Sequence, residues 1–489
     1  MGLQDPRRAF TRRQFLGYLG AGGAALGLAA CGGSSGGSGS PHLTNGSSAQ
    51  LPSWLQSEAK QYRGRSLNVV ASQQYFATTN QDFVNACQTF GKLTGTNVTV
   101  AVINVDTGNI VSREDSAVKS GNGPDIGFVD ASRFAAEYYQ LGDLQPVTDV
   151  VNELSSRYGP PPDVNKILLQ YGPNKDWYGI PYFSITNGWF VRKDWLQEKG
   201  IKDSEFKTLQ QARDVALEIS DPSQQRYGWG MTFNNGGDGT NTIGTVLNAW
   251  GAAVASNDGT KVVFGNGPET TDAVTFLADL YSNPKYKPML PPGVLSWTDT
   301  SNNQAWLAGI IGLTTNAFSL YAQSKADNNP VYGKTRIFDG FTGPAIKQPI
   351  LIPASQAFVL FKGAREPGLA KLLAKYLVYG APLLQMVKDS VGLVLPAYQN
   401  IWTSNSYYLH GDPSFGTLHT EMSEPLPVKT TTGLAFPQTP SPGSQAVNSS
   451  YPLNDMLASI VSKKATIKEA IATAKQRIIQ IFEQQGLPQ

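Results

Sequence analysis

Short apolar runs alternate with segments of helical periodicity along most of the chain. Residues 67–71 and 98–102 each have the composition of a short buried strand. Between them, Phe83, Cys87 and Phe90 recur three to four residues apart, which predicts a helix that ends at Gly95. The order strand, helix, strand favours an α/β fold.

The same alternation continues toward the C-terminus. The next pairs of predicted strand and helix are 126–130 with 134–140, 189–191 with a helix from Lys193, and 262–264 with a helix over 269–281 that begins after Pro268. Residues 453–485 predict two amphipathic helices separated by a break at 462–464. Residues 396–450 are rich in Pro, Ser and Thr and predict loops.

The N-terminus has the pattern of an export signal. Arg12 and Arg13 precede a weakly apolar, glycine-rich run, 15–30, which ends at Cys31 in the small-residue pattern of a lipoprotein cleavage site. The run is too short and too rich in glycine for a membrane-spanning helix. We expect residues 1–30 to be a twin-arginine lipoprotein signal peptide, Cys31 to be lipidated, and residues 31–60 to form a flexible Gly/Ser-rich tether. The body is then expected outside the cytoplasm, anchored to the outer face of the cytoplasmic membrane.

The charge balance argues against nucleic acid as a partner. The 489 residues include 39 Lys+Arg and 37 Asp+Glu, and only 16% of all residues are charged. Removal of residues 1–30 leaves 35 basic and 36 acidic residues, without a basic cluster interleaved with aromatics. A neutral ligand is therefore more consistent with the composition.

Cysteine and histidine point to neither a disulfide nor a metal or cofactor site. Cys31 and Cys87 are the two cysteines, and acylation of the first leaves the second without a partner. The apolar pattern around Cys87 predicts a small buried side chain. His42, His410 and His419 are far apart in the sequence and lack ligand spacing.

Three short motifs stand in order along the chain: a Gly-x-Gly-Pro-Asp strand, a Tyr-Gly-Ile-Pro segment and a C-terminal Lys-x-Thr-x-x-Glu-Ala helix. Together with two further segments, they resemble the extracellular solute-binding proteins of ABC importers, the family that includes maltose-binding protein. Residues 307–312 depart from the family pattern, because the usual Lys and Ala-Met are absent after the glycine. The matching segments are 121–130, 178–194, 262–281, 303–318 and 462–478.

The resemblance implies a type II periplasmic-binding-protein fold, with two α/β lobes that close around a ligand by a hinge movement. By analogy, one lobe comprises 61–182 plus about 358–435, and the other 183–357 plus about 436–489. The crossings are expected near 182–188 and 355–361. The implied function is a monomeric, non-enzymatic receptor that binds a carbohydrate, in particular an oligosaccharide, and delivers it to the permease subunits.

A saccharide site needs flat aromatic side chains for sugar C–H faces and polar side chains for paired hydroxyl groups. Polar candidates follow predicted strands or lie in the loop 234–242, and the aromatic candidates are spread along the chain. The expected ligand-binding residues are Gln73, Gln74, Asp130, Ser132, Arg133, Tyr182, Trp229, Asn241, Trp250, Trp297, Phe318 and Tyr451.

Each of these residues also has a structural interpretation. Aromatic side chains are common in cores, and polar residues at strand ends often cap helices. Arg133 could pair with Asp130 or Glu137. The glycine-rich residues 235–239 could cradle a phosphate, but they lack a following Lys-Ser/Thr and favour a turn.

Two other classes of function stay open. A surface glycosidase would need two carboxylates flanking a sugar bond, and their separation cannot be obtained from the sequence. The same fold could instead bind a polyamine, a metal or a phosphorylated solute. Adjacent tyrosines such as Tyr138 and Tyr139 could serve a ferric site, but they lie in a predicted helix, where neighbours diverge, so core packing is favoured.

Overall fold

One long strand, β6 (Ile180–Arg192), holds the sheet together. The computed structural model describes residues 50–105, 110–338, 340–347, 353–412, 414–416 and 441–489. All of them belong to one unit, Ala49–Gln489. The predicted signal peptide, Cys31 and most of the predicted tether lie outside the described residues.

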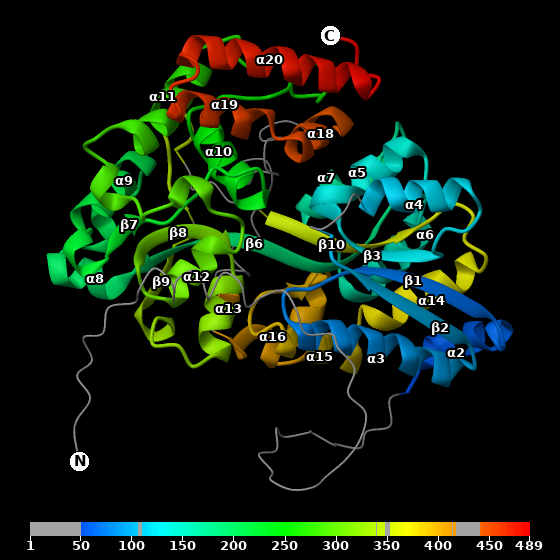
Figure 1. Ribbon diagram of the computed structural model, residues 1–489. Helices are drawn as coiled ribbons and strands as arrows, with labels where there is room; N and C mark the ends of the chain where they lie inside the picture. Colours follow the sequence, from blue (N-terminus) through cyan, green and yellow to red (C-terminus); the bar gives the residue numbers. More distant parts are fainter. Residues whose placement is uncertain (1–49, 106–109, 339, 348–352, 413, 417–440) are drawn as a thin grey trace, which may run out of the picture. The chain divides into compact units, whose positions relative to one another are not determined.

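The partners of β6 change halfway along its length. Residues 180–186 pair antiparallel with β10 (Pro353–Leu360), whereas residues 187–191 pair antiparallel with β8 (Ile311–Ala317). Strand β9 (Thr335–Phe338) also pairs with the second half of β6. We call the elements around β10 the first lobe and those around β8 the second lobe (Figure 1). The residue limits predicted for the lobes stay predictions.

The first lobe has the predicted α/β alternation. Its strands β2 (Asn97–Ile103), β1 (Ser66–Ser72) and β3 (Ile126–Asp130) are parallel, and β10 runs antiparallel beside β3. Helix α3 (Ala77–Thr94) connects β1 to β2 and ends at Gly95, which adopts a φ of 68°. The expected buried side chain of Cys87 is confirmed, because it lies on α3 with no exposed surface.

The second lobe surrounds β7 (Tyr227–Trp229), which runs parallel to β8. The predicted helix 269–281 is confirmed as α11 (Pro268–Ser282), which extends one residue further at each end. The strand predicted over 262–264 is wrong, since Val262 makes only an isolated bridge with Ala255, residue 263 is irregular and a turn begins at residue 264. Gly259 and Gly265, with φ of 73° and 72°, bend the chain on both sides of this apolar triplet.

The two predicted C-terminal helices are confirmed. Helices α19 (Pro452–Val461) and α20 (Ile467–Gln484) are separated at the expected break, where Lys463 has a φ of 60°. Both pack against α11, and their buried residues, among them Ile478 and Phe482, join the core of the second lobe. The preceding helix α18 (Pro442–Ser450) also contacts α5 (Ala131–Leu141) of the first lobe.

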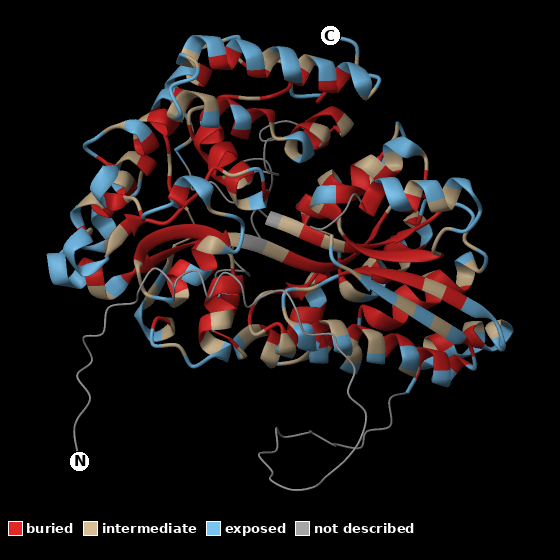
Figure 2. Cartoon of the chain, viewed as in Figure 1, coloured by how far each residue is buried: buried red, intermediate tan, exposed pale blue. Residues whose placement is uncertain are grey.

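Burial follows the layers of the fold. Figure 2 shows buried residues along the strands and on the helix faces turned toward them, with exposed residues on the outer helix faces. In the first lobe, the rings of Phe128, Tyr182 and Phe358 pack against one another across three neighbouring strands. In the second lobe, Trp229 and Leu313 belong to a separate core cluster.

Two expectations for irregular segments need correction. The tether was predicted to extend to residue 60, but residues 53–59 form helix α2 (Ser53–Ala59), which packs against α14 (Pro367–Leu377). Leu51, Leu55 and Ala59 are buried four residues apart, a short helical signal within a polar stretch. The described part of 396–450 contains the 3-10 helix η7 (Gln399–Ser404), helix α16 (Tyr407–His410) and α18, whereas loops were predicted.

The remaining elements complete the two lobes. Among the described residues, no helix combines the length and the apolar composition that crossing a membrane requires. The other α-helices are α4 (Ile110–Lys119), α6 (Thr148–Tyr158), α7 (Asp163–Leu169), α8 (Lys193–Lys199), α9 (Leu209–Glu218), α10 (Gly237–Ala249), α12 (Ser301–Leu307), α13 (Ser319–Ala326) and α15 (Ala381–Asp389). The short strands are β4 (Gln170–Tyr171), β5 (Asp176–Trp177) and β11 (Leu395–Pro396). The other 3-10 helices are η1 (Lys60–Tyr62), η2 (Asp203–Glu205), η3 (Pro222–Gln224), η4 (Lys287–Met289), η5 (Val294–Ser296) and η6 (Tyr332–Lys334).

Helix α2 yields a first test of the fold. Leu55 has no exposed surface, so Leu55→Ala should lower the free energy of unfolding by about 2–5 kcal/mol, because it leaves a cavity. Chemical denaturation of the purified protein measures this change. Ser57→Ala, at an exposed position of the same helix, is the control and should change stability little. Equal stability of both variants would contradict the docking of α2.

Candidate functional site

Polar side chains gather where the first-lobe strands end. Gln74 follows β1, Asp130 ends β3, and Gln356 of β10 lies opposite Asp130 in the sheet register. The Gln356 amide donates a hydrogen bond from Nε2 to Gln74 Oε1 at 2.9 Å. We call Ser72, Gln74, Asp130, Ser132 and Gln356 the first-lobe cluster.

Two buried oxygen atoms of this cluster have no hydrogen-bond partner among the described residues. They are Ser72 Oγ and Gln356 Oε1, and Ser72 as a whole is only 5% exposed. Buried polar atoms in native proteins are usually paired with protein, water or ligand. These two oxygens therefore mark the first-lobe cluster as a place where a polar molecule can bind.

Asp130 and Ser132 also have structural roles. The Asp130 carboxylate caps helix α5 by accepting from the backbone N–H of Ser132 at 3.0 Å. Ser132 Oγ in turn accepts from the backbone N–H of Ser355 at 3.2 Å. Burial raises the pKa of the Asp130 carboxyl, although Arg133 and these hydrogen bonds oppose the shift. Both residues thus fix the geometry of the cluster.

Gln73 and Arg133, also predicted as ligand residues, lie at its exposed edge. The backbone N–H of Gln73 donates to the Ile103 carbonyl, and the Gln73 side chain is exposed. The Arg133 side chain is exposed as well, with its guanidinium 5.0 Å from the centre of the Phe134 ring.

A second polar cluster lies in the second lobe, at the ends of β8 and the starts of α10 and α12. Asp238 Oδ2 accepts from Asn302 Nδ2 at 2.8 Å and from Asn316 Nδ2 at 3.2 Å. Asn316 Nδ2 also donates to Asn303 Oδ1 at 2.7 Å, and Asn303 Nδ2 donates to Ser319 Oγ at 3.1 Å. We call Asp238, Asn302, Asn303, Asn316 and Ser319 the second-lobe cluster.

Tyr75 connects this cluster to the first lobe. Asn303 Nδ2 donates to the Tyr75 hydroxyl at 3.3 Å, and Tyr75 comes directly after Gln74 in the loop between β1 and α3. The Tyr75 side chain is 44% exposed, and its ring meets Phe76 edge-on at 5.0 Å. Burial of the remaining part raises the pKa of the Tyr75 hydroxyl, against the opposing effect of the Asn303 hydrogen bond.

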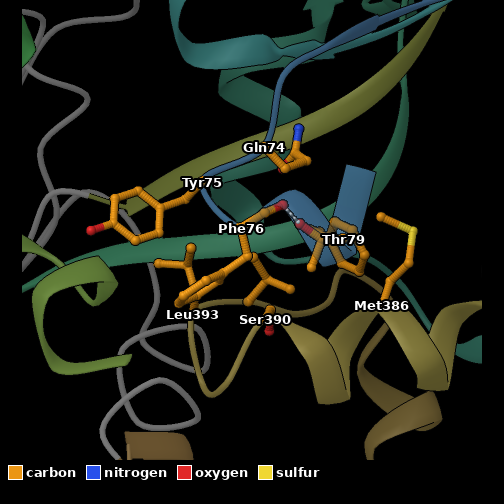
Figure 3. Close-up of a pocket in the computed structure, with 9 residues that line it drawn as sticks. Gln74, Tyr75, Phe76, Thr79, Met386, Ser390 and Leu393 are labelled. Carbon is orange, nitrogen blue, oxygen red and sulfur yellow. Dashed lines mark hydrogen bonds between the residues drawn. The ribbon is translucent and has the colours of Figure 1, made fainter. Parts of the chain in front are cut away.

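A mostly apolar pocket holds the loop that carries Gln74 and Tyr75. Figure 3 shows Phe76 and Thr79 beside Met386 and Leu393, with a hydrogen bond from Thr79 Oγ1 to the Phe76 carbonyl at 2.7 Å. The apolar packing of Phe76 anchors the loop on the end of α15. This anchor positions Gln74 and Tyr75 beside the two polar clusters.

The glycine-rich loop before α10 binds a side chain of the protein itself. Asp299 accepts hydrogen bonds from the backbone N–H of Gly237 at 2.9 Å and of Asp238 at 3.2 Å, and from Asn234 Nδ2 at 3.1 Å. A Cβ on Gly236 would lie 2.3 Å from the Asp299 carboxylate. Residues 235–236 form a bend, whereas 237–239, interpreted from sequence as part of a turn, begin helix α10 beside the Asp299 carboxylate.

Asp238 is electrostatically perturbed within this arrangement. Burial, followed by the nearby Asp299 carboxylate, raises the pKa of Asp238 to about 8, while the hydrogen bond from Asn302 acts in the opposite direction. The carboxyl group therefore takes up a proton far more readily in the folded protein than in the unfolded chain.

Three aromatic residues predicted to bind ligand lie in cores instead. Tyr182, Trp229 and Phe318 are at most 1% exposed. The Tyr182 hydroxyl donates to Met386 Sδ at 3.1 Å, Trp229 Nε1 donates to the Tyr281 hydroxyl at 3.4 Å, and the Phe318 ring packs against Phe190. These three aromatic residues fill the interior in this structure, and their roles in binding stay predictions.

The four other predicted residues are half-buried and lie around the second lobe. Trp250 follows the last turn of α10, at the end away from Asp238, and packs on Phe276 with ring centres 4.5 Å apart. Trp297 lies two residues before Asp299, and Asn241 lies in the second turn of α10. Tyr451 separates α18 from α19 with a φ of 56°. Their roles in binding stay predictions.

The residues that join the two clusters were not singled out from the sequence. Tyr75, Gln356, Asn302, Asn303 and Asn316 come from four separate segments of the chain. The one local signal was the Asn302-Asn303 pair at a helix start, where amide side chains more often serve as caps. In the described part of the chain, no three His, Cys, Asp or Glu side chains are grouped so that they could hold a metal ion.

Comparison with known families and structures identifies the class of protein. Residues 71–378 match the family of bacterial extracellular solute-binding proteins, and the chain belongs to this family. A comparison with curated proteins finds no match. The family and fold are those of transport binding proteins.

Solved structures share the two-lobed fold. An ABC transporter solute-binding protein from Thermotoga lettingae, bound with alpha-D-tagatose, is 20% identical with a TM-score of 0.69, covering 86% of this chain and 100% of its own. The maltose-bound MalE3 of T. maritima is 15% identical with a TM-score of 0.66, covering 85% and 99%. A substrate-binding protein of Listeria monocytogenes in complex with cycloalternan is 14% identical with a TM-score of 0.66, covering 86% and 99%.

The raised pKa of Asp238 predicts how stability depends on pH. Between about pH 4 and pH 8 the folded state holds a proton that the unfolded chain has released, so the free energy of unfolding falls as pH rises. Asp238→Asn keeps an acceptor for Asn302 but removes the titration. The stability of this variant relative to the parent should therefore increase from pH 5 to pH 8, measured by chemical denaturation.

A matched control is Asp221→Asn. The Asp221 carboxylate caps η3, and its hydrogen bonds with Ser223 lower its pKa, so it stays ionised across this pH range. Its stability relative to the parent should not change between pH 5 and pH 8. The same flat profile for Asp238→Asn would contradict the assigned environment of Asp238.

Proposed function

We propose that this protein is the receptor of an ABC importer and that it binds a carbohydrate, in particular an oligosaccharide, between the first-lobe and second-lobe clusters. Membership of the extracellular solute-binding family supports the receptor role. Structural neighbours crystallised with tagatose, maltose, cycloalternan and mannotriose support a sugar as the class of ligand.

The observation that carries this proposal is the placement of the two clusters. Each lies at strand ends of its own lobe, and the hydrogen bond between Tyr75 and Asn303 joins them. In open α/β sheets, ligands bind beyond the carboxyl ends of the strands. Ligand contacts from both lobes are what a receptor that closes by a hinge needs.

The chemistry of the clusters suits sugar hydroxyls. Amide side chains such as those of Gln356, Asn303 and Asn316 carry both a donor and an acceptor, so they can bond adjacent hydroxyl groups in pairs. The exposed ring of Tyr75 offers a flat apolar face for the C–H side of a sugar. The unpaired Ser72 Oγ and Gln356 Oε1 would complete their hydrogen bonds with the ligand.

The strand pairings suggest how binding would be transmitted. Strand β6 belongs to both lobes, and its partners change between residues 186 and 187, so a small rotation there separates the clusters. A sugar that contacts both clusters stabilises the closed form. The closed form is then the form that the permease recognises.

A melting screen tests the proposal. Mono- and oligosaccharides, polyamines, metal ions and sugar phosphates are added to the purified protein, and a ligand at 100 times its Kd should stabilise it by about 2.7 kcal/mol. A saccharide that raises the melting temperature and is recovered unchanged supports the receptor. Consumption of the sugar would indicate a glycosidase, and a shift with only a polyamine, metal or phosphate compound would overturn the cargo.

Tyr75 provides a test of the site itself. Tyr75→Ala should weaken binding of the saccharide about tenfold, because it removes a hydroxyl and a ring face at the junction of the two clusters. Titration calorimetry measures this loss. Tyr379→Ala is the control, since Tyr379 is similarly exposed and stacks on Tyr158 rather than on either cluster. Unchanged affinity in Tyr75→Ala would contradict the proposed location.

Membrane anchoring through Cys31 is part of the same proposal. A diacylglyceryl group on this residue would hold the receptor on the outer face of the cytoplasmic membrane. Cys31→Ser should move the protein from the membrane fraction to the soluble fraction and abolish incorporation of labelled fatty acid. Ser34→Ala, three residues away, should change neither property. Membrane retention of Cys31→Ser would show that another segment anchors the chain.

A further inference from the structure

Asp299 is an exposed carboxylate that stands beside the second-lobe cluster. It occupies the donors that the start of α10 presents, through its bonds with Gly237, Asp238 and Asn234. Asp238 connects Asp299 to the cluster. Its backbone N–H donates to Asp299, and its side chain accepts from Asn302 and Asn316. A ligand that contacts these asparagines therefore lies close to a fixed negative charge.

The loop around Asp299 is built to keep this carboxylate in place. A Cβ at Gly236 would lie 2.3 Å from Asp299 Oδ1, and one at Gly239 would lie 2.1 Å from the Asn234 carbonyl. Both positions therefore favour glycine, so that Asn234 and the helix start can close around the carboxylate. The influence of Asp299 extends into the cluster, since its charge contributes to the raised pKa of Asp238 after the effect of burial.

Among the described residues, the hydrogen bonds of the second-lobe cluster involve no cation, and the cation beside the first-lobe cluster, Arg133, lies at its exposed edge. The hydrogen-bonded partners in the two clusters are amides, hydroxyls and carboxyl groups, together with backbone groups. The unpaired Ser72 Oγ and Gln356 Oε1 likewise suit a hydroxyl-bearing ligand, and the amide oxygen can only accept. An anionic group placed here would be repelled by the Asp299 carboxylate. The backbone N–H groups of Gly237 and Asp238, which could otherwise bind it, already donate to Asp299.

We propose that Asp299 determines specificity by restricting the site to uncharged saccharides and rejecting those that carry a carboxylate or a phosphate. This inference rests on the proposed function and deepens it, because it assigns the charge class of the sugar. It also accounts for the glycine-rich residues 235–239. The backbone N–H donors of Gly237 and Asp238, which resemble those of a phosphate-binding loop, are hydrogen-bonded to Asp299.

The experiment compares matched ligands by titration calorimetry. The neutral probe is whichever of maltotriose, mannotriose and cellotriose raises the melting temperature most, and the anionic probe is the same sugar with the primary alcohol of its non-reducing end oxidised to a carboxylate. The parent protein should bind the acid at least about tenfold more weakly than the neutral sugar. Asp299→Asn should reduce this preference severalfold, and raised salt should reduce it in the parent.

Controls separate the possible outcomes. Asp221→Asn makes the same substitution at a helix cap outside both clusters and should keep the full preference. If Asp299→Asn lowers the melting temperature, Asp299→Glu, which keeps the charge, should retain the preference. Equal binding of both probes by the parent, or an unchanged preference in Asp299→Asn, overturns the role of Asp299 while the sugar receptor stands. Failure of all three neutral trisaccharides to bind, with a polyamine, metal or phosphate compound binding instead, would overturn both proposals.

Discussion

The hydrogen bonding of β6 in both lobes is the constraint on which the rest of the structure depends. Residues 180–186 complete the first-lobe sheet through β10, and residues 187–192 complete the second through β8 and β9. Because a strand cannot leave either sheet without losing backbone hydrogen bonds, β6 keeps the two lobes attached. In the proposed mechanism, the lobes rotate about β6 and thereby separate or join the two polar clusters.

Around β6 the chain separates two kinds of residue. Aromatic side chains such as Phe128, Tyr182 and Phe358 fill the interior of the sheet beside β6. Amide side chains such as Gln356 and Asn316, on the strands next to β6, form the polar clusters. A buried polar network is most stable when its members are paired, and the unpaired oxygens of Ser72 and Gln356 are therefore the positions where we propose that ligand hydroxyls bind.

Much of the fold could be predicted because its information is local. The periodicity of Phe83, Cys87 and Phe90 reflects one face of α3, and the predicted break coincides with the positive φ of Lys463, which a continuous α-helix does not contain. The strand predicted over 262–264 does not form, because the glycines on either side bend the chain despite the apolar composition of the triplet. Helix α2 was not predicted, because the buried positions Leu51, Leu55 and Ala59 stand within a polar stretch.

The site was harder to predict from the sequence, since Tyr75, Gln356 and Asn303 meet only through the tertiary fold. Of the predicted contacts, Gln74, Asp130 and Ser132 do lie together, whereas Trp229 and Phe318 show that an aromatic near a strand end fills a core as readily as it lines a site.

The central claim is that a saccharide draws the two lobes together about β6. Small-angle X-ray scattering of the purified protein, with and without the saccharide identified by melting, tests it most directly. The account predicts that the radius of gyration falls when the sugar is added and that Tyr75→Ala needs more sugar for the same change. A saccharide that binds tightly while the scattering profile stays the same would contradict closure as the response to ligand.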